Sequence, residues 1–432
     1  MKDQTHQPLH NPYEKPSVRN YALVILTLVY TFNFIDRQLL SILQEAIKEE
    51  LLLSDSQLGL LTGFAFAMFY VTAGIPIARL ADRGNRRNIV AISIGLWSFM
   101  TAISGFVQNF VQLLLARIGV GIGEAGGSPP SHSIVSDIFP PEQRASALAF
   151  YSTGVNLGIM FGFLFGGWLN VFFGWRVAFL VVGVPGIVMA GILLATVREP
   201  IRGLMENKQV TAEQVPFSVV VSELWKRKTF RHMAIGGGLN AFVGYGTVNW
   251  LASFFIRSHE MTTGELGTWL ALSTGLAGAV GLYLGGVMGD KLGAKDKRWY
   301  LWVPALATIM VVPFQFIIYL TGNTLLALIM VFVPGFLQNV YLGNSIATTH
   351  NLVGLRWRST ASALLFLILN IIGLGLGPFA VGYLSDTLSD VYGSESLRYA
   401  MLGLLPGVMV WSSIHFFMAS RTLDEDLARA PD

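Results

Sequence analysis

Residues 198–228 of the 432-residue sequence, from Arg198 to Lys228, read REPIRGLMENKQVTAEQVPFSVVVSELWKRK, and this is the longest polar stretch in the chain. Long apolar runs lie on both sides of it. A helix needs about 20 apolar residues to cross the hydrocarbon core of a membrane, and by that measure six runs precede the stretch and six follow it. We therefore predict an all-α polytopic membrane protein with twelve transmembrane helices in two six-helix lobes.

The predicted spans are 20–44, 57–80, 88–109, 111–137, 145–171 and 175–197 before the polar stretch, and 231–256, 265–289, 299–321, 324–350, 359–385 and 396–419 after it. They predict a cytoplasmic N-terminal tail at 1–19, an N-terminal lobe at 20–197, a cytoplasmic linker at 198–230, a C-terminal lobe at 231–419 and a cytoplasmic tail at 420–432. Within the linker, apolar residues from Val219 to Trp225 precede a basic run and predict an amphipathic helix on the membrane surface. Six and six spans around a long loop are typical of the major facilitator architecture.

The composition agrees with a membrane protein, because 53% of the residues are hydrophobic and only 13% are charged, whereas soluble domains carry about 25% charged residues. The mean hydropathy is +0.56. The chain contains no cysteine, which excludes disulfides and thiolate metal sites. The seven His residues show no metal-ligand spacing, and no nucleophile–base pattern is evident. We therefore expect no cofactor, no metal site and no enzymatic activity.

The distribution of Lys and Arg predicts the orientation, because positive residues collect on the cytoplasmic side. With a cytoplasmic N-terminus, most of the 29 basic residues lie inside. The exceptions are Lys48, Arg176, Arg257 and Arg398 outside, and Arg37 and Arg117 within spans. Both termini are then cytoplasmic. The net charge of +3 reflects this topology, and we expect no nucleic-acid partner. The absence of a glycosylation sequon suits a multi-pass protein of a bacterial inner membrane, expected to be a monomer.

The two halves repeat short patterns. Ala145-Ser146-Ala147-Leu148 recurs at 361–364, an offset of 216 residues that also relates Gly166 to Gly382. Asp82-Arg83 is echoed by Asp290-Lys291 at the end of the eighth span. These repeats predict a pseudo-two-fold relation between the lobes.

Glycine ladders mark two spans: Gly154, Gly158, Gly162 and Gly166 in the fifth, and Ala277, Gly281, Gly285 and Gly289 in the eighth. Such small residues permit close helix packing in lipid. Two interpretations stay open at this point, static packing within a lobe and a smooth surface along which the lobes slide.

Four ionisable residues lie deep inside predicted spans: Asp36 and Arg37 in the first, Arg117 and Glu124 in the fourth. A charge at the membrane centre costs about 2.5–3.5 kcal/mol on insertion scales, and such residues usually mark an ion or substrate path. Burial raises the pKa of a carboxyl group and a nearby Arg lowers it, so Asp36 and Glu124 are predicted to carry protons. Arg37 and Arg117 are predicted to hold an anionic substrate or to act as counter-charges. A buried ion pair that joins two helices is the alternative.

The geometry of a helix constrains these four residues. Arg117 and Glu124 share one helix face about 10.5 Å apart along the axis, which is too far for direct contact unless the side chains reach toward each other. Asp36 and Arg37 diverge by about 100° and are expected to contact different neighbours.

The C-terminal lobe has no ionisable residue deep in its spans. It offers polar and aromatic residues that are predicted to line a cavity, together with Asn33 from the first span: Tyr245, Asn249, Trp250, Gln338, Tyr341, Ser345 and Thr348. Helix–helix hydrogen bonds are the alternative role for this set. A charged N-terminal lobe facing an uncharged amphipathic wall suits a substrate with a charged head and a long apolar body.

Two motifs resemble signatures of the Spinster family of the major facilitator superfamily: Asn33-Phe34-Ile35-Asp36-Arg37, and the fourth-span segment RIGVGIGEA from Arg117 to Ala125. The segment Ala78–Arg83, followed by Arg86-Arg87, resembles the superfamily's loop motif between its second and third spans. The resemblance implies proton-coupled transport of sphingosine phosphates or lysophospholipids. It further implies that Asp36 and Glu124 are proton sites with Arg37 and Arg117 as their partners or phosphate ligands. It implies a cytoplasmic gate formed by Asp82, Arg83, Glu142 and Arg144, with Asp290 in the looser second copy of the motif.

Three functions are therefore considered. The first is a proton-coupled secondary transporter that moves an amphipathic anionic lipid by alternating access, with protons and membrane lipids as its other partners. The second is a proton-coupled transporter of a small organic anion, such as a sugar acid or carboxylate. The third is a membrane receptor or scaffold that does not transport.

Overall fold

The structure is a computed structural model that describes residues 12–203, 217–354 and 357–429. The described part of the chain is almost entirely helical and has no strand. The first half contains α1 (Pro16–Leu51), α2 (Asp55–Gly59), α3 (Ala65–Arg83), α4 (Arg86–Ser104), α5 (Phe110–Glu124), α6 (Ser128–Ile138) and α7 (Pro141–Thr196). The second half contains α8 (Phe217–Lys226), α9 (Lys228–His259), α10 (Thr263–Leu270), α11 (Ala277–Gly293), α12 (Trp299–Leu320), α13 (Thr324–Leu337), α14 (Val340–Asn351), α15 (Arg358–Leu369), α16 (Gly377–Tyr392) and α17 (Ser396–Ala428).

Three π-helical segments, η2 (Leu60–Phe64), η3 (Ala271–Leu276) and η5 (Asn370–Leu376), join α2 to α3, α10 to α11 and α15 to α16. Short 3₁₀ turns, η1 (Pro12–Glu14) and η6 (Gly393–Glu395), precede α1 and α17.

The predicted twelve-span fold is confirmed, although nine helical stretches of the described chain are long and apolar enough to count as spans by composition. One of them is α7, which turns at Gly174, where φ is +78°, and so crosses twice. Residues 360–428 likewise contain two crossings, which meet at Gly393 with φ of +54°. The 32-residue α9 is not one of the nine, but it packs along α17 as the remaining crossing. Glycine permits the positive φ at both turns.

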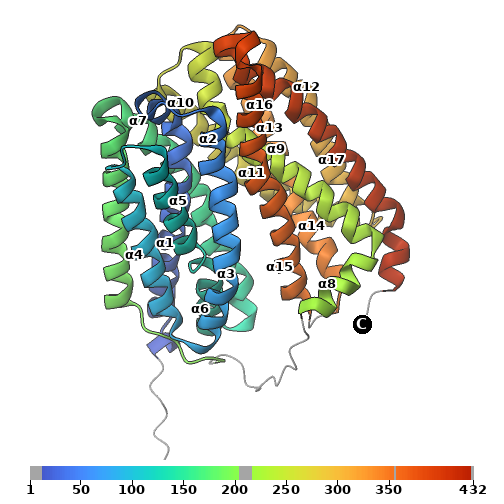
Figure 1. The fold of residues 1–432 in the computed structure, drawn as a ribbon. Coiled ribbons are helices and arrows are strands. Elements are labelled where there is room, and N and C mark those ends of the chain that lie inside the picture. The colour runs from blue at the N-terminus through green and yellow to red at the C-terminus, as the bar shows by residue number, and fades with distance from the viewer. Residues whose placement is uncertain (1–11, 204–216, 355–356, 430–432) are drawn as a thin grey trace, which may run out of the picture.

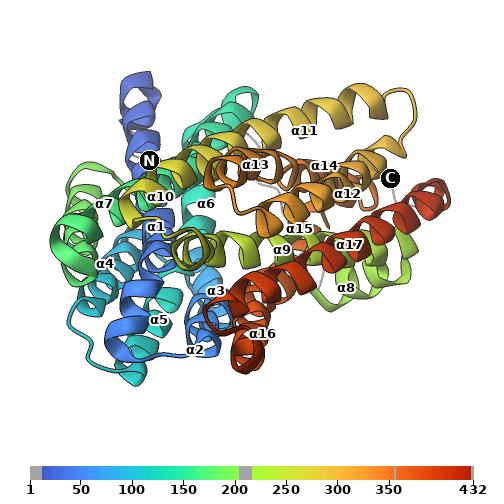
Figure 2. The same cartoon turned by 90° about the horizontal axis from the view of Figure 1, so that it is seen from above.

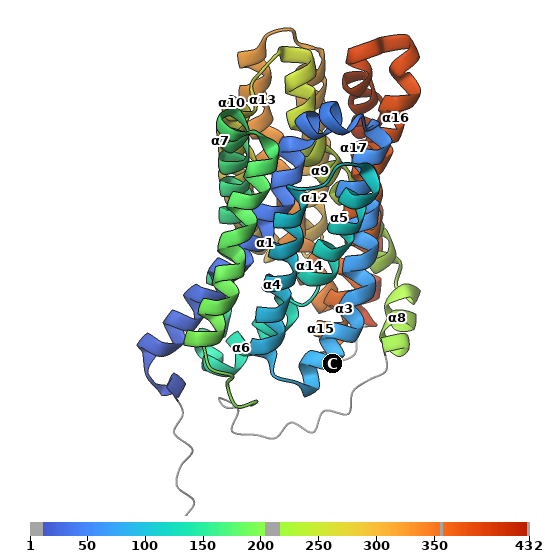
Figure 3. The ribbon, with the colours of Figure 1, turned by 60° about the vertical axis from the view of Figure 1, so that its left-hand side comes forward.

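The helices form two bundles (Figure 1), with α1–α7 in one and α9–α17 in the other, and Figure 2 shows them side by side from above. We call the end where α2 begins and α16 finishes the α2 end, and the opposite end, where α8 lies, the α8 end. Both ends of the described chain lie toward the α8 end (Figure 1). The ribbons of the two bundles approach each other at the α2 end and diverge toward the α8 end (Figure 1). Figure 3 shows α8 at the opposite end of the molecule from the end of α16.

The segments outside the spans are only partly described. Residues 1–11 of the predicted N-terminal tail, 204–216 of the predicted linker and 430–432 of the predicted C-terminal tail lie outside the described residues. The described part of the linker includes α8, which buries Val220 and Leu224 and exposes Val219 and Trp225. It packs against α9 and α15.

Glycines set how closely the helices pack, and the predicted ladders act inside each half. Gly154, Gly158 and Gly162 lie against the backbone and side chains of α1, and Gly281 and Gly285 lie against α13 and α14. The sliding-surface interpretation of the ladders is therefore wrong, because neither ladder faces the other half.

The two halves instead contact each other most extensively along two seams, α7 with α10–η3 and α2–η2 with α16–η5. At each seam a glycine lies against a backbone carbonyl of the opposite half. A Cβ on Gly167 would lie 2.3 Å from the Thr263 oxygen, and a Cβ on Gly382 would lie 2.3 Å from the Asp55 oxygen. Only glycine permits so close an approach.

Two spans are interrupted midway, at corresponding places in the two halves. The fourth breaks between α5 and α6 at residues 125–127, and the tenth breaks between α13 and α14 at residues 338–339. Discontinuous helices in corresponding positions of transporter repeats frame substrate sites. The break in the fourth span ends α5 at Glu124.

Candidate functional site

Four charged side chains, three of them buried, cluster between α1 and α5. Asp36 and Arg37 come from the middle of α1, while Arg117 and Glu124 come from α5. Asp36, Arg117 and Glu124 are 1–3% exposed. The structure thus brings together all four residues that the sequence singled out.

The ion pair of the cluster joins two helices. Arg37 Nε donates to Glu124 Oε2 at 2.6 Å, and the two side chains are 14% and 0% exposed. The Arg37 guanidinium lies within 4.8–5.1 Å of the ring centres of Phe34, Phe66 and Tyr70. Aromatic faces attract a cation at such distances, so Arg37 is held by both a carboxylate and π systems.

Asp36 has a different environment. Its Oδ2 accepts a hydrogen bond from Thr101 Oγ1 at 3.1 Å, and Oδ1 has no partner among the described residues. As expected from their divergence on α1, Asp36 faces α4 and Arg37 faces α5. The two carboxylates of the cluster therefore differ in their partners. Glu124 is bonded to a cation, whereas Asp36 is bonded to a hydroxyl group.

Arg117 approaches the Phe66 ring to 5.4 Å and forms no direct bond to Glu124 among the contacts of the described chain. Its Nε and Glu124 Oε1 are buried without a hydrogen-bond partner there. Phe66 thus lies beside both guanidinium groups. Buried polar atoms are normally paired, so the unpaired atoms of Asp36, Arg117 and Glu124 make this cluster the candidate functional site.

The residues predicted to line a cavity divide into two groups. Asn33 is buried. Tyr245 and Tyr341 are partly exposed, and Gln338 is buried with Nε2 unpaired among the described residues. Trp250, Ser345 and Thr348 are 0–2% exposed. These three pack inside the second half in this structure, and the cavity-lining role of the set stays a prediction. Trp250 donates to the Pro378 carbonyl at 2.8 Å.

The residues predicted to form a gate lie at the α8 end, where the structure does not join them. Asp82, Arg83 and Glu142 are exposed, and no bond links Asp82 to Arg144 within the described chain. Arg144 donates to the Phe139 carbonyl at 3.2 Å. Asp290 accepts from the Tyr300 hydroxyl at 3.0 Å and lines a pocket of about 400 Å³ with Lys297 and Asn351, among others. The gate stays a prediction.

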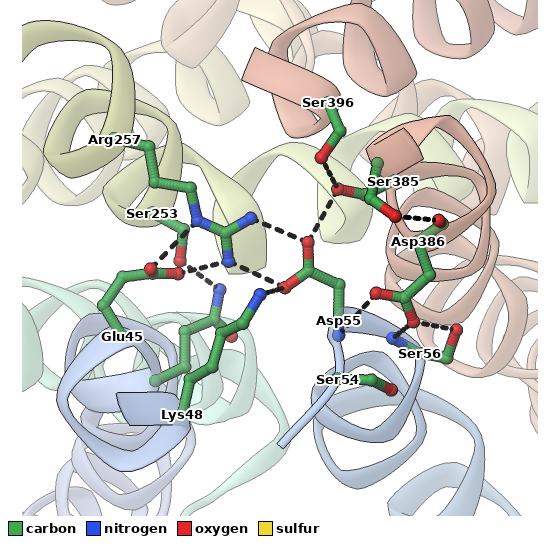
Figure 4. A network of polar contacts seen from close by, with 12 residues as sticks. Glu45, Lys48, Ser54, Asp55, Ser56, Ser253, Arg257, Ser385, Asp386 and Ser396 are labelled. Atoms are coloured by element: carbon green, nitrogen blue, oxygen red, sulfur yellow. Dashed lines mark hydrogen bonds and ion pairs between the residues drawn. The ribbon is translucent and has the colours of Figure 1, made fainter. Parts of the chain in front are cut away.

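A second polar cluster, which the sequence analysis missed, joins the halves at the α2 end (Figure 4). Arg257 of α9 forms two bonds to Glu45 of α1, at 2.9 and 2.7 Å, and two bonds to Asp55 of α2, both at 2.7 Å. Lys48 also bonds Asp55. We call Glu45, Lys48, Asp55, Arg257, Ser385 and Asp386 the outer network.

The remaining members of the outer network, Ser385 and Asp386, come from α16. Ser385 Oγ donates to Asp55 Oδ2 at 2.6 Å. Asp386 accepts from the backbone N–H groups of Asp55 and Ser56, at 3.0 and 2.7 Å, and from the Ser56 hydroxyl. The start of α2 in one half is therefore capped by a carboxylate of the other half (Figure 4).

Further hydrogen bonds join α1 to α9 just below the outer network. Asn249 Oδ1 accepts from the Ser41 hydroxyl at 2.8 Å, and Gln44 Nε2 donates to the Asn249 carbonyl and the Ser253 hydroxyl. Asn249 was predicted to line a cavity, and here it joins the halves. The halves are thus held together at the α2 end by buried polar contacts.

Comparisons with known proteins agree on one family. The profile of the Major Facilitator Superfamily matches residues 26–378. The chain is 34% identical to a protein of Mycolicibacterium smegmatis described as an MFS-type efflux pump, over 98% of this chain and 97% of that protein. It is 29% identical, over 66% of this chain and 67% of the relative, to a probable galactarate/D-glucarate transporter of Bacillus subtilis.

Among solved structures, the chain matches a bacterial homolog of the human lysosomal transporter Spinster, in an inward-facing and unoccupied conformation. The TM-score is 0.87 and the identity 33%, with 96% of this chain and 98% of that chain covered.

Proposed function

The chain belongs to the Major Facilitator Superfamily and, within it, to the Spinster family, and from this premise we propose that it is a proton-coupled secondary transporter of an amphipathic anionic lipid. It works by alternating access in a bacterial inner membrane, as a monomer with both termini in the cytoplasm. That the chain is a polytopic transporter of this superfamily follows from its family. The lipid, the proton and the orientation are our proposal.

The observation that carries the proposal is the unequal pairing of two carboxylates in one buried cluster. Glu124 holds Arg37, whereas Asp36 holds only the Thr101 hydroxyl. A charged group buried without a cation is costly, so Asp36 is the natural place to bind a proton. An anionic headgroup that reaches Arg37 competes with Glu124 for the same guanidinium.

Coupling follows from that competition. When a substrate phosphate takes Arg37, Glu124 loses its cation inside a buried site, and a proton that reaches Glu124 by way of Asp36 removes the uncompensated charge. When the substrate leaves, Arg37 pairs with Glu124 again and the proton is released. The substrate and the proton are thereby linked through one guanidinium.

The proposed orientation of the protein in the membrane supports release of the substrate into the cytoplasm. The outer network holds the α2 end together, and the two bundles diverge at the α8 end (Figure 1). With the basic clusters in the cytoplasm, the α8 end faces the cytoplasm and the α2 end faces the outside. The structure then corresponds to the inward-facing half of the cycle, in which the gate residues Asp82, Arg83, Glu142, Arg144 and Asp290 are apart.

A small organic anion is the second candidate substrate. It is favoured by the similarity to a probable galactarate/D-glucarate transporter and by the two guanidinium groups beside Phe66. The second half argues against a small anion, because its spans contain the partly exposed Tyr245 and Tyr341 and no cation deep in the membrane. A compact dianion is better held by cations from both sides.

Proteoliposomes with an internal pH indicator separate the two substrates. We expect a lysophospholipid or sphingosine phosphate to stimulate proton flux, galactarate to have no effect, and Asp36→Asn to abolish the flux. Asp390→Asn, an identical change at an exposed position of α16, is the control and keeps the flux. Flux driven by galactarate alone would assign the small-anion function, and no flux with either substrate would reject proton coupling.

A further inference from the structure

Phe66 of α3 lies beside both guanidinium groups of the charged cluster. The centre of its ring is 5.0 Å from the Arg37 guanidinium and 5.4 Å from the Arg117 guanidinium, and the side chain is 1% exposed. An aromatic face attracts a cation at such distances. Arg37 is also bonded to Glu124, whereas Arg117 forms no hydrogen bond or ion pair among the contacts of the described chain. For Arg117 the ring therefore takes the place of an ion-pair partner.

The same ring covers the face of α5 between Arg117 and Glu124. Gly121 follows Arg117 by four residues and precedes Glu124 by three, so the three residues share one helix face. A Cβ on Gly121 would lie 3.4 Å from Cδ2 of the Phe66 ring and 3.0 Å from the Phe66 carbonyl oxygen. Phe66 thus fills the space along α5 through which the Arg117 side chain would have to extend to reach Glu124.

Glu124 has room in its hydrogen bonding for a second cation. Its Oε1 and the Nε of Arg117 are both buried without a partner within the described chain. The two residues are about 10.5 Å apart along the helix axis, a separation that they can bridge only if their side chains extend toward each other. If Arg117 took the place of Arg37 at Glu124, no charge would be left uncompensated when a substrate binds Arg37, and binding would not require a proton.

We propose that Phe66 is a positioning residue that keeps Arg117 from replacing Arg37 at Glu124, and that it thereby makes proton uptake obligatory when a substrate takes Arg37. The inference rests on the proposed coupling mechanism and identifies the side chain that blocks a path without a proton. The two arginines then have different tasks. Arg37 exchanges between Glu124 and the substrate anion, whereas Arg117 stays on the ring of Phe66.

The variant Phe66→Leu removes the aromatic face and keeps an apolar side chain. The full-length protein in weakly buffered detergent is mixed with sphingosine phosphate, while a pH indicator records protons and equilibrium dialysis records bound lipid. We expect uptake to fall from about one proton per bound lipid in the parent to less than about half of that in the variant. Phe69→Leu, the same change at an exposed position of α3, is the matched control and should keep the parental ratio.

A second substitution separates positioning from packing. In Phe66→Leu combined with Arg117→Gln the replacing cation is absent, so the ratio of protons to lipid should return to the parental value. If Phe66 only fills space, the ratio stays low in the double variant, and the inference is overturned. An equal fall of the ratio in Phe69→Leu would overturn it as well.

A ligand-free crystal structure of Phe66→Leu gives a result that does not depend on the lipid. It should show Arg117 hydrogen-bonded to Glu124. If the parent binds lipid without proton uptake, the proposed function fails, and this structure alone decides the inference; it also decides if the variant binds no lipid. The inference is overturned if Arg117 stays apart from Glu124 in the variant, or if Phe66→Leu keeps the parental ratio of protons to lipid.

Discussion

Glu124 accepts its hydrogen bond from Arg37 on a neighbouring helix, at 2.6 Å, and forms no direct bond to Arg117 on its own helix. The ion pair therefore couples α1 to the end of α5 at the break in the fourth span. Because α1 is also hydrogen-bonded to α9 of the other half through Ser41 and Gln44, a change in the charge of Glu124 can affect the contact between the halves through α1.

Glu124→Gln tests whether this pair takes part in the conformational switch. The variant leaves Arg37 without a carboxylate, so the protein should favour whichever state hydrates Arg37 better, and a few kcal/mol is enough to invert a two-state balance. Spin-label distances across the α8 end should show a conformational ratio that depends less on pH than in the parent. A purely structural pair predicts lower thermal stability with an unchanged pH dependence.

Asp36→Asn should abolish proton-driven transport and retain expression, folding and lipid binding. The amide cannot exchange a proton in the working pH range, but its oxygen still accepts from Thr101. Uptake assays with and without an imposed pH gradient, together with lipid binding in detergent, check both parts. Thr101→Val is the companion variant, with a loss of about 1 kcal/mol of stability and coupling intact. Gradient-driven uptake by Asp36→Asn at the parental rate would remove Asp36 from the proton path.

Arg257→Gln should open the α2 end. Glu45 loses its cation, whereas Asp55 keeps Lys48, so the cost falls on Glu45. Breaking a buried pair by removing one partner costs about 3–5 kcal/mol, and Arg257 is 11% exposed, so we expect at least a tenfold shift toward the open form. The measurement is the label distance between Gln108→Cys and Val391→Cys.

The double variant Arg257→Gln with Glu45→Gln is the control for that prediction. It removes the unpaired carboxylate and should recover part of the closed form. If the double variant is as open as the single one, the uncompensated charge of Glu45 is not the cause.

Much of the fold could be predicted from the sequence, because each span is a local apolar run and the turn at Gly174 falls between two of them. The divergence of Asp36 and Arg37 was also predictable from helix geometry. The partner of Glu124 was not, since it depends on how α1 and α5 are rotated against each other.

The outer network could not be predicted either, because it also depends on how helices far apart in the sequence pack together. Glu45, Asp55, Arg257 and Asp386 each resemble an ordinary charge at a span end, and up to 331 residues separate the bonded pairs. The capping-box pattern from Ser54 to Gln57 is visible in the sequence and indicates a helix start. It carries no information about the carboxylate that caps this start from the other half.

Gly382→Ala tests the close contact at the α2–α16 seam. Its new Cβ would lie 2.3 Å from the Asp55 carbonyl oxygen, so the seam must separate, at a cost of about 1–3 kcal/mol typical of overpacking. We expect a lower melting temperature and slower transport. Gly403→Ala on α17 is the matched control, since no atom lies within 4 Å of its added Cβ. Equal effects of both variants would mean that helix propensity, and not the seam, is responsible.

The competition between substrate and Glu124 for Arg37 is the centre of the proposed mechanism, and proton movement on substrate binding tests it most directly. Purified protein in weakly buffered detergent is mixed with a lysophospholipid or sphingosine phosphate while a pH indicator records protons taken up or released. The mechanism predicts uptake of about one proton per bound lipid in the parent and none in Glu124→Gln that still binds lipid. Binding in the parent with no proton uptake, or equal uptake in both proteins, would contradict it.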